Sequence, residues 1–427
     1  MARLFAYGTL REAAVLARVV EHGAKPLGET VLEGFAVFST DQGYPVLFPV
    51  AGGTVRGRLW ELAAADLPAL DRYEGAREAV PLYLRRRVPV RGGPAWVYLG
   101  NPLRWERGGA GYVLRGEAPA RRVPPPQERF AGSLLAAAAG DALGMPVEGL
   151  TAEEIRARWG SVRHYLSGGD LGPGQYTDDT QQTLALARSL LVAAGGFAPE
   201  AWAGELVEWY RGGPRRAGRA SLQAARNLAR GAYPSGVSSV GCGAAMRVAP
   251  LGLLYARDGA RLLASAAQSA RLTHEHPAAV AGAVAMAWAV GEAATTATVE
   301  AASFLEGAAE VARGWDRELA GRIRRVEEFW GLEPAAALGR IGTSGDVRET
   351  LPAALYCFLL SPGDLAGVLT RAVEAGGDTD SVASMAGALA GAYGGACSLP
   401  RAWYDGLEDR EEIEEVARAL WELARRS

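Results

Sequence analysis

Two clusters of acidic and hydroxyl side chains stand far apart in the sequence, and each precedes an apolar, alanine-rich stretch that is typical of a helix. The clusters are Thr177-Asp178-Asp179 and Asp378-Thr379-Asp380-Ser381. Short polar residues at a helix start are ordinary caps, and capping explains either cluster alone. A cap needs only one such side chain, however, and crowded carboxylates repel one another unless a cation or a proton compensates. Brought together, the clusters would form an oxygen-ligand site for hard divalent cations.

Other stretches add candidate functional groups. Glu148 ends the glycine-punctuated run GDALGMPVE at residues 140–148. The glycine loop at 241–243 would present backbone N–H groups that suit an anion such as a diphosphate. His274 and His276 stand two positions apart, but no further Cys or His follows at zinc-finger spacing, which argues against a structural zinc ion. We interpret His274 as lining a ligand cleft, with a buried structural histidine as the alternative.

The elements that must position these groups indicate two domains. Short β-type runs separated by Gly and Pro dominate before residue 120 of the 427, and Ala/Leu-rich segments with helical spacing dominate after it. Three prolines in a row at 124–126 favour a stiff, extended connector. We therefore predict a small mixed α/β domain at 1–118, a proline-rich linker at 119–128 and a nearly all-α domain at 129–427.

Composition limits the functional classes. A net charge of −3 and a pI near 6.0 leave no global basic field that would favour nucleic-acid binding. The scattered cysteines show no CxxC spacing, and with no signal peptide at the N-terminus they indicate a cytoplasmic protein. The longest apolar run, Ala278–Gly291, is too short to span a bilayer and predicts a buried helix, so no membrane partner is expected. Small residues at 387–394 predict close approach of another helix.

The order of motifs after residue 129 resembles that of the ADP-ribosylglycohydrolase family. The matching runs are GDALGMPVE, YTDDTQ, GCGAAMRVAPLG, THEHP and GGDTDSVASMAGALAGA. The resemblance implies a compact all-α fold with two Mg²⁺ or Mn²⁺ ions at the base of an ADP-ribose cleft. The metal ligands that it implies are Thr177, Asp178, Asp179, Asp378, Asp380 and Ser381. It also implies substrate contacts from Gly241, Cys242, Gly243 and His274, although the family often has Asn where Cys242 stands.

The implied reaction is hydrolysis of a glycosidic bond at the ribose anomeric carbon, which passes through an oxocarbenium-like state. Glu148, Asp178 and Asp179 are each candidates for general acid or base. The substrate would be an ADP-ribosylated protein, nucleic acid or small molecule, and the acceptor stays open among arginine, serine, a base and a small molecule.

The N-terminal part holds a second candidate site. Tyr7-Gly8-Thr9-Leu10 form a turn between a strand and a helix, and such a turn exposes backbone N–H groups to an anion. Glu74 precedes a glycine, and on composition alone it is a surface residue at a helix end. The runs YGTLR, YPVLFP, GRLWEL, LDRYEG and YLRRRVPV together, however, resemble the gamma-glutamylcyclotransferase-like family over residues 1–105.

That second resemblance implies a small β-barrel with flanking helices that holds a γ-glutamyl small molecule. The turn at residues 7–10 would bind the carboxylate of the substrate, and Glu74 would take a proton from its α-amine. The amine would then attack the γ-carbonyl and release 5-oxoproline without a metal. We therefore expect a bifunctional enzyme. The alternative is a cyclotransferase whose C-terminal domain is a non-catalytic ADP-ribose or nucleotide sensor or a structural domain, and the N-terminal domain could equally be a binding module.

Overall fold

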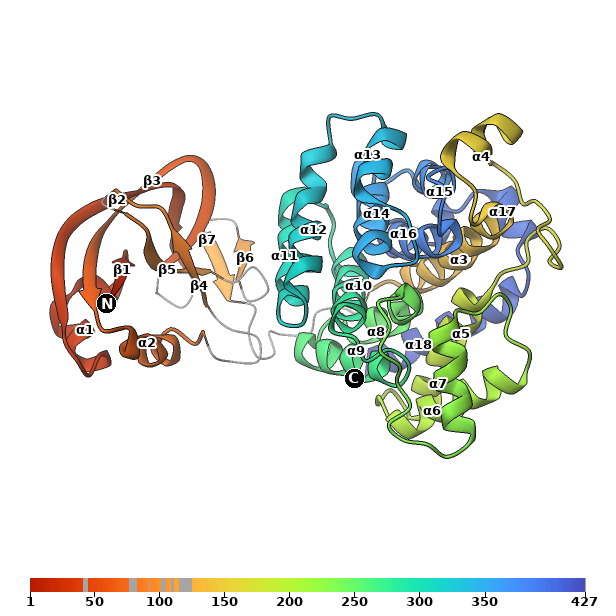
Figure 1. Ribbon diagram of the computed structural model, residues 1–427, viewed down its shortest axis with the longest axis horizontal. Coiled ribbons are helices and arrows are strands. Elements are labelled where there is room, and N and C mark those ends of the chain that lie inside the picture. Colours follow the sequence, from red (N-terminus) through yellow and green to blue (C-terminus); the bar gives the residue numbers. More distant parts are fainter. Residues whose placement is uncertain are drawn as a thin grey trace. The chain divides into compact units, whose positions relative to one another are not determined.

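The computed structural model describes residues 1–40, 45–76, 83–91, 93–100, 105–108, 111–114 and 125–426. The chain divides into two compact units, Met1–Arg121 and Arg122–Ser427 (Figure 1). The predicted mixed α/β and all-α characters of the two parts are confirmed. Most of the predicted linker, 119–124, lies outside the described residues, as does Tyr44 of the YPVLFP run.

The N-terminal unit is built on a five-stranded sheet with the strand order β2-β3-β1-β5-β4. Its strands are β1 (Ala2–Ala6), β2 (Ala24–Phe38), β3 (Val46–Leu62), β4 (Tyr83–Val88) and β5 (Ala95–Gly100), with helices α1 (Ala13–Val19) and α2 (Leu67–Tyr73) and a separate hairpin of β6 (Trp105–Gly108) and β7 (Gly111–Leu114). β1 runs antiparallel to β3 and parallel to β5. The edge strands β2 and β4 do not pair with each other among the described residues, so this sheet is open. The family resemblance implied a small β-barrel.

Alternating side chains give this sheet two packed faces. Leu4 and Trp60 belong to one buried cluster, whereas Phe5 and Leu59 belong to another. Successive residues of a strand point to opposite faces, so the two clusters lie on the two sides of β1 and β3. Gly57 lets β3 approach β1 closely, because a Cβ there would lie 2.5 Å from the carbonyl oxygen of Ala6.

The regular secondary structure of the C-terminal unit, in its described residues, is helical apart from isolated bridges. Its α-helices are α3 (Gln127–Gly144), α4 (Ala152–Trp159), α5 (Asp178–Val192), α6 (Pro199–Arg211), α7 (Arg219–Ala229), α8 (Ala249–Leu254), α9 (Gly259–Arg271), α10 (Pro277–Thr295), α11 (Ala301–Arg313), α12 (Arg317–Arg325), α13 (Pro334–Ile341), α14 (Val347–Leu360), α15 (Leu365–Val373), α16 (Thr379–Gly394), α17 (Arg401–Gly406) and α18 (Arg410–Arg426). The short 3₁₀ turn η3 (Met145–Val147) directly precedes Glu148, and η4 (Cys242–Ala244) includes two residues of the 241–243 loop.

Helices α3 and α16 lie side by side at the centre of this unit (Figure 1). A Cβ on Gly391 would lie 2.0 Å from the carbonyl oxygen of Gly132, and one on Gly140 would lie 2.3 Å from that of Ala383. The pairing is antiparallel, because residues later in α3 meet residues earlier in α16. The close helix approach predicted from the small residues of 387–394 is thus confirmed, and it brings the start of α16 to the end of α3.

Two helical segments are long and apolar enough to cross a membrane by composition, Gln127–Val147 and Pro277–Thr295, but 89% and 83% of their apolar windows are buried in the unit. The predicted buried helix at Ala278–Gly291 is confirmed as part of α10. The prediction that it is too short to span a bilayer is wrong, because the helix continues beyond Glu292 to Thr295.

We expect Gly140→Val to destabilise the C-terminal unit by at least about 3 kcal/mol, because the added side chain meets the backbone of α16 and neither helix can yield locally. Urea unfolding followed by circular dichroism measures the change. Gly204→Ala in α6 is the matched control. Nothing lies within 4 Å of a Cβ at that position, so it should be neutral or stabilising by up to about 1 kcal/mol. Equal stability of the two variants would contradict the packing argument.

Candidate functional site

The two acidic clusters that the sequence separates lie together in the C-terminal unit, at the first turns of α5 and α16. The Ser381 hydroxyl donates to Asp179 Oδ1 at 3.3 Å, which links the two helix starts directly. Both helices also contact α3. The site is therefore built where one helix ends and two others begin.

Asp141, in the last turn of α3, holds the start of α5. Its carboxylate accepts the backbone N–H of Thr177 at 2.9 Å and the backbone N–H of Thr180 at 3.0 Å, and the Thr180 hydroxyl donates to it at 2.6 Å. The first N–H groups of a helix have no partner within the helix, so a buried carboxylate there satisfies them. Asp141 lies inside the GDALGMPVE run, but this role was not among those expected from the sequence, because it depends on contacts with a distant segment.

The start of α16 is positioned by glycines and by two bonds to other segments. Gly376 and Gly377 have φ values of +76° and +77°, which L side chains rarely adopt, and a Cβ on Gly377 would lie 2.3 Å from the carbonyl oxygen of Thr343. The backbone N–H of Asp378 donates to that same oxygen at 2.7 Å, and the Thr379 hydroxyl donates to Gly144 O at 2.8 Å. The chain thus delivers Asp378 beside the end of α3.

Three carboxylates converge at this point. Single carboxylate oxygens of Glu148, Asp378 and Asp380 all lie within 4.8 Å of one another. Such a spacing suits oxygen ligands around one cation. Asp179 adds a buried oxygen, Oδ2, that has no hydrogen-bond partner in the described part of the chain. An unpartnered carboxylate oxygen in the interior is costly, and a bound cation would satisfy it.

The electrostatics of the cluster also fit a cation. The pKa values of Asp178, Asp179 and Asp380 are raised well above their usual range, first by burial and then by the neighbouring carboxylates. The pKa values of Asp141 and Glu148 are raised for the same leading reason. These acids repel one another in a dry environment, so positive charge placed among them would be strongly favoured.

The hydroxyl groups of the two clusters have structural partners as well. The Thr177 side chain accepts the backbone N–H of Asp179 at 3.4 Å, so it caps α5, and Ser381 donates to Asp179. Thr177 and Ser381 are buried beside the carboxylates. To act as metal ligands, as predicted, their hydroxyl groups would have to give up the hydrogen bonds described above.

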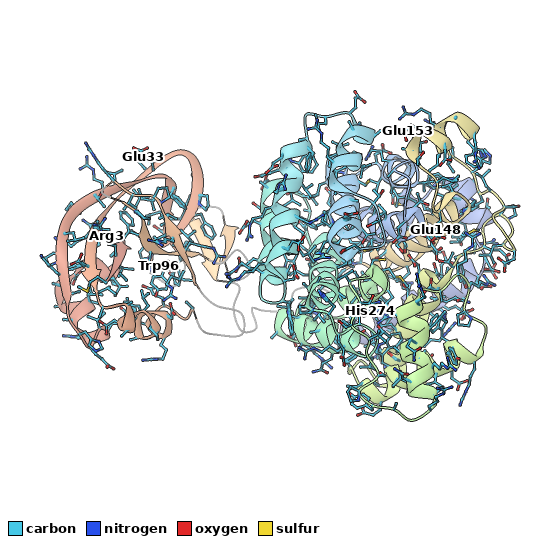
Figure 2. All side chains as sticks on the ribbon, viewed as in Figure 1. Arg3, Glu33, Trp96, Glu148, Glu153 and His274 are labelled. Carbon is cyan, nitrogen blue, oxygen red and sulfur yellow. The ribbon has the colours of Figure 1, made fainter. Side chains whose placement is uncertain are left out.

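Glu148 occupies a different environment from the other carboxylates. It follows η3 at the position labelled in Figure 2. Its side chain is 40% exposed. Arg216 lies 3.5 Å from one of its oxygens and also donates to Met145 O at 2.8 Å. Glu148 is therefore a carboxylate with access to solvent at the edge of a buried acidic cluster, as a proton-transferring group requires.

The predicted substrate loop 241–243 packs against His274. A Cβ on Gly243 would lie 2.9 Å from His274 Cε1, so only glycine fits beside the ring. The N–H groups of Gly241 and Cys242 already donate, to Ser239 Oγ and Gly345 O, and the Cys242 thiol donates to Asp378 Oδ2 at 3.3 Å. The loop thus lies beside the acidic cluster, and two of its N–H groups are engaged within the chain.

His274 is 2% exposed, and its burial lowers its pKa to about 3, so the ring is neutral. Its Nδ1 atom lies 2.8 Å from the Thr273 hydroxyl. His276 accepts the backbone N–H of Ala278 and caps α10, which gives it a structural role. The candidate metal-ligand group found among the described residues contains only carboxylates.

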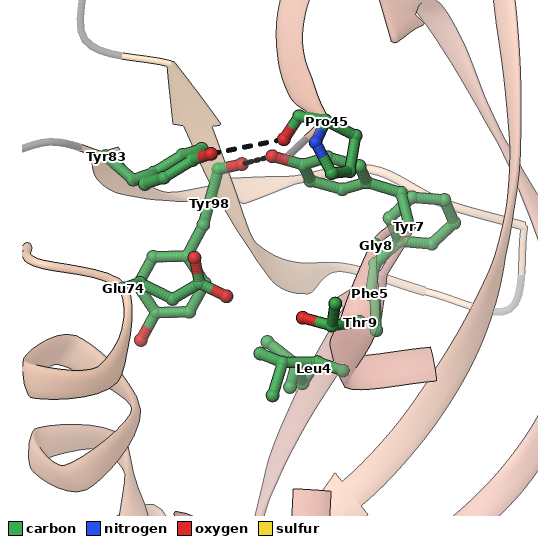
Figure 3. A pocket seen from close by; sticks show the side chains of 11 residues that line it. Leu4, Phe5, Tyr7, Gly8, Thr9, Pro45, Glu74, Tyr83 and Tyr98 are labelled. Carbon is green, nitrogen blue, oxygen red and sulfur yellow. Dashed lines mark hydrogen bonds between the residues drawn. The ribbon is translucent and has the colours of Figure 1, made fainter. Parts of the chain in front are cut away.

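The N-terminal unit holds a separate pocket (Figure 3). It is lined by Leu4, Phe5, Ala6, Tyr7, Gly8, Thr9, Leu10, Pro45, Glu74, Tyr83 and Tyr98. The turn at 7–10 and Glu74, which the sequence places far apart, therefore line one pocket. Gly8 packs tightly against another residue of the pocket wall, because a Cβ there would lie 3.0 Å from the Pro45 ring.

The tyrosine hydroxyls of this pocket are held by other groups. Tyr7 donates to Tyr98 O at 2.8 Å, Tyr83 donates to Pro45 O at 3.1 Å, and Tyr98 donates to Asp71 at 2.8 Å. Glu74 lies among these rings, and burial raises its pKa from 4.5 to about 7. A carboxylate with that pKa can take up a proton near neutral pH.

Comparisons with known proteins agree with both units. A family model described as ADP-ribosylglycohydrolase matches residues 122–427, and one described as gamma-glutamyl cyclotransferase, AIG2-like, matches residues 4–115. An uncharacterized protein of Archaeoglobus fulgidus is 41% identical over 302 residues, which cover 70% of this chain and 97% of that protein. The ADP-ribosyl-[dinitrogen reductase] glycohydrolase of Rhodospirillum rubrum is 30% identical over 298 residues, which cover 68% of this chain and 94% of that protein.

A solved ADP-ribosylglycohydrolase-related protein complex aligns with a TM-score of 0.58 and 36% sequence identity, covering 70% of this chain and 99% of that chain. The helical fold and its acidic site thus define a glycohydrolase class. The chain belongs to the ADP-ribosylglycohydrolase family, with an N-terminal unit of the gamma-glutamyl cyclotransferase, AIG2-like type, and the two resemblances indicated by the sequence motifs are confirmed.

We expect Asp380→Asn to raise the melting temperature of the metal-free protein, because it removes one of several buried like charges. The free energy of unfolding should rise by on the order of 1 kcal/mol. The amide oxygen can still accept the N–H of Ser381. Thermal unfolding in EDTA at pH 8 measures the shift. Asp364→Asn, at an exposed N-cap that bonds Gly367, is the control and should change nothing. A lower melting temperature for Asp380→Asn would contradict the repulsion argument.

Proposed function

We propose that the C-terminal unit hydrolyses the glycosidic bond between ADP-ribose and an acceptor, using two Mg²⁺ or Mn²⁺ ions. The observation that carries the proposal is the buried acidic cluster at the starts of α5 and α16, in which one Asp179 oxygen finds no partner among the residues that the structure describes. The family membership and the relatives named as ADP-ribosyl hydrolases support the same reaction.

The residues that would hold the ions are Thr177, Asp178, Asp179, Asp378, Asp380 and Ser381. Bound ions of this kind orient hydroxyl groups of a substrate and lower the pKa of a water molecule. Glu148, exposed at the edge of the cluster, would take a proton from water or give one to the leaving group. His274 is neutral, so it would contact substrate through hydrogen bonding or packing.

The proposed substrate is an ADP-ribosylated protein, nucleic acid or small molecule. We expect the acceptor to be decided by loops at the mouth of the cleft, since the chemistry at the ribose is common to all three. Free ADP-ribose is the shared product, so a single assay can compare them.

We expect purified protein to release ADP-ribose from one of three substrates, an ADP-ribosylated arginine peptide, a serine peptide or DNA, in Mg²⁺ or Mn²⁺ but not in EDTA. Asp378→Ala should lower this release by at least about 100-fold while the protein stays folded, because it removes a ligand from the acidic cluster. Full activity of a folded Asp378→Ala protein would refute the metal-site assignment. No release by the wild type would favour the alternative of a sensor domain.

For the N-terminal unit we propose a second activity, release of 5-oxoproline from a γ-glutamyl small molecule. The specific observation that favours it is the partly buried carboxylate of Glu74, which lines the same pocket as the start of a helical turn at Thr9–Arg11. The turn would bind the substrate carboxylate through its first N–H groups. Glu74 would accept a proton from the substrate amine, which then closes a five-membered ring.

Because only the ionised form of Glu74 can accept a proton, we expect 5-oxoproline release to rise with pH and to level off above about pH 7. Glu74→Gln should abolish it. The folded unit binds the Glu74 proton more tightly than the unfolded chain, so stability is lost as pH rises from 4.5 to about 7.

Glu74→Gln should therefore be more stable than wild type at pH 8, by on the order of 1–3 kcal/mol. Thermal unfolding at pH 5 and pH 8 checks this shift and separates loss of the base from loss of the fold. If the Glu74→Gln protein released 5-oxoproline at the wild-type rate, Glu74 would not be the base.

A further inference from the structure

The largest charged side chain wholly buried in the C-terminal unit is that of Arg247, which neither acidic cluster contains. It is 0% exposed, and no ion pair is found for it among the described residues. Its guanidinium lies over the Trp202 ring, 5.1 Å from the centroid. Burying a cation without a carboxylate beside it is costly, so the hydrogen bonds it makes are informative.

One branch of those bonds leads to the acidic cluster. Arg247 Nη1 donates to Gln182 Oε1 at 2.6 Å, and Gln182 Nε2 donates to Asp178 Oδ2 at 2.6 Å. Arginine can only donate, so the amide oxygen of Gln182 must face Arg247 and its NH₂ group must face Asp178. Arg247 therefore decides which way Gln182 points, and Gln182 holds one oxygen of Asp178.

The other branch leads to the ring beside the glycine loop. Arg247 Nη2 donates to Thr273 Oγ1 at 2.6 Å. The single Thr273 hydroxyl hydrogen can go to His274 Nδ1, 2.8 Å away, or to Ala270 O, 3.3 Å away. The shorter contact favours the ring, which makes Nδ1 the acceptor and leaves the proton on Nε2. A Cβ on Gly241 would lie 3.5 Å from that Nε2 atom, so the N–H faces the loop.

We infer that Arg247 is a positioning residue that serves two parts of the site at once, orienting Asp178 through Gln182 and setting the tautomer of His274 through Thr273. The inference rests on the proposed glycohydrolase function. A purely structural arginine would not need hydrogen bonds that lead to proposed site residues. Both branches from Arg247 end on such residues, Asp178 and His274. Partners behind a metal ligand typically change metal affinity by about 10–100-fold when removed.

The two branches can be separated by substitution. Gln182→Leu should weaken Mn²⁺ binding by at least about 10-fold, because Asp178 loses its donor. Thr273→Val should leave Mn²⁺ affinity within about twofold and weaken ADP-ribose binding by about 10-fold, because His274 loses its tautomer control. Arg247→Lys keeps the charge but replaces a planar fork by one ammonium, so it should weaken both.

The matched control is Arg129→Lys. Arg129 also donates to several partners, but these are the backbone carbonyls of Ala293, Ala294 and Thr296, remote from the acidic cluster. It should lower the melting temperature and leave both affinities unchanged. Calorimetric titration of the full chain measures Mn²⁺ alone, and then ADP-ribose at saturating Mn²⁺.

A second readout does not depend on binding. The chain has four histidines, so ¹⁵N-histidine labelling can report which ring nitrogen of His274 carries the proton. We expect the Nε2–H form in the wild type and a different tautomer balance in Thr273→Val. A wild-type Nδ1–H form would overturn the histidine branch.

The outcomes for the proposed function and for this inference are distinct. A wild type that binds Mn²⁺ and ADP-ribose, with variants that match it, would overturn the positioning role and leave the proposed function standing. The positioning role would also be overturned if Gln182→Leu and Thr273→Val each weakened Mn²⁺ binding and ADP-ribose binding to the same extent, because the two branches would then not be separate. A wild type that binds neither ligand would overturn the proposed function and with it the premise of the inference.

Discussion

The backbone contact between α3 and α16 is the constraint on which the helical unit depends. Glycines at the crossing points let the two helices approach until the carbonyl of one lies where the side chain of the other would be. Because the pair is antiparallel, the end of α3 meets the start of α16, and Asp141 of α3 in turn holds the start of α5. Helix packing thereby brings the acidic residues of two helix starts together in the interior, although their carboxylates repel one another.

That repulsion is a cost that the rest of the unit does not remove. The pKa values of Asp178, Asp179 and Asp380 are raised, with burial as the leading cause, and one Asp179 oxygen has no hydrogen-bond partner among the described residues. A protein that only needed stability would gain by replacing such groups, because buried like charges destabilise the folded state. Their presence is understandable if positive charge enters the site. In the N-terminal unit, burial alone raises the pKa of Glu74 to about 7, without a contribution from a neighbouring carboxylate.

Among the described residues, Arg247 is the one buried arginine, and neutral side chains connect it to this arrangement. Gln182 and Thr273 accept hydrogen bonds from Arg247 and lead to Asp178 and His274, and no ion pair of Asp178 is found in the described part of the chain. A direct Arg–Asp pair would lower the pKa of Asp178 and compete with the metal. An amide or hydroxyl between them orients the ligand without that competition, which is a physical reason for the relay.

The sequence by itself determined the two fold types and the acidic clusters as candidate ligands, because helix starts, strand periodicity and turn glycines are local signals. The pairing of the Tyr7–Leu10 turn with Glu74 came from the family resemblance of the motifs and not from a local signal. Only the tertiary structure decided the role of Asp141, the convergence of Glu148 with Asp378 and Asp380, and the two branches from Arg247. These features join segments that are distant in the chain. Which atoms meet there depends on helix packing and on hydrogen-bond partners, and neither leaves a period or a spacing in the sequence.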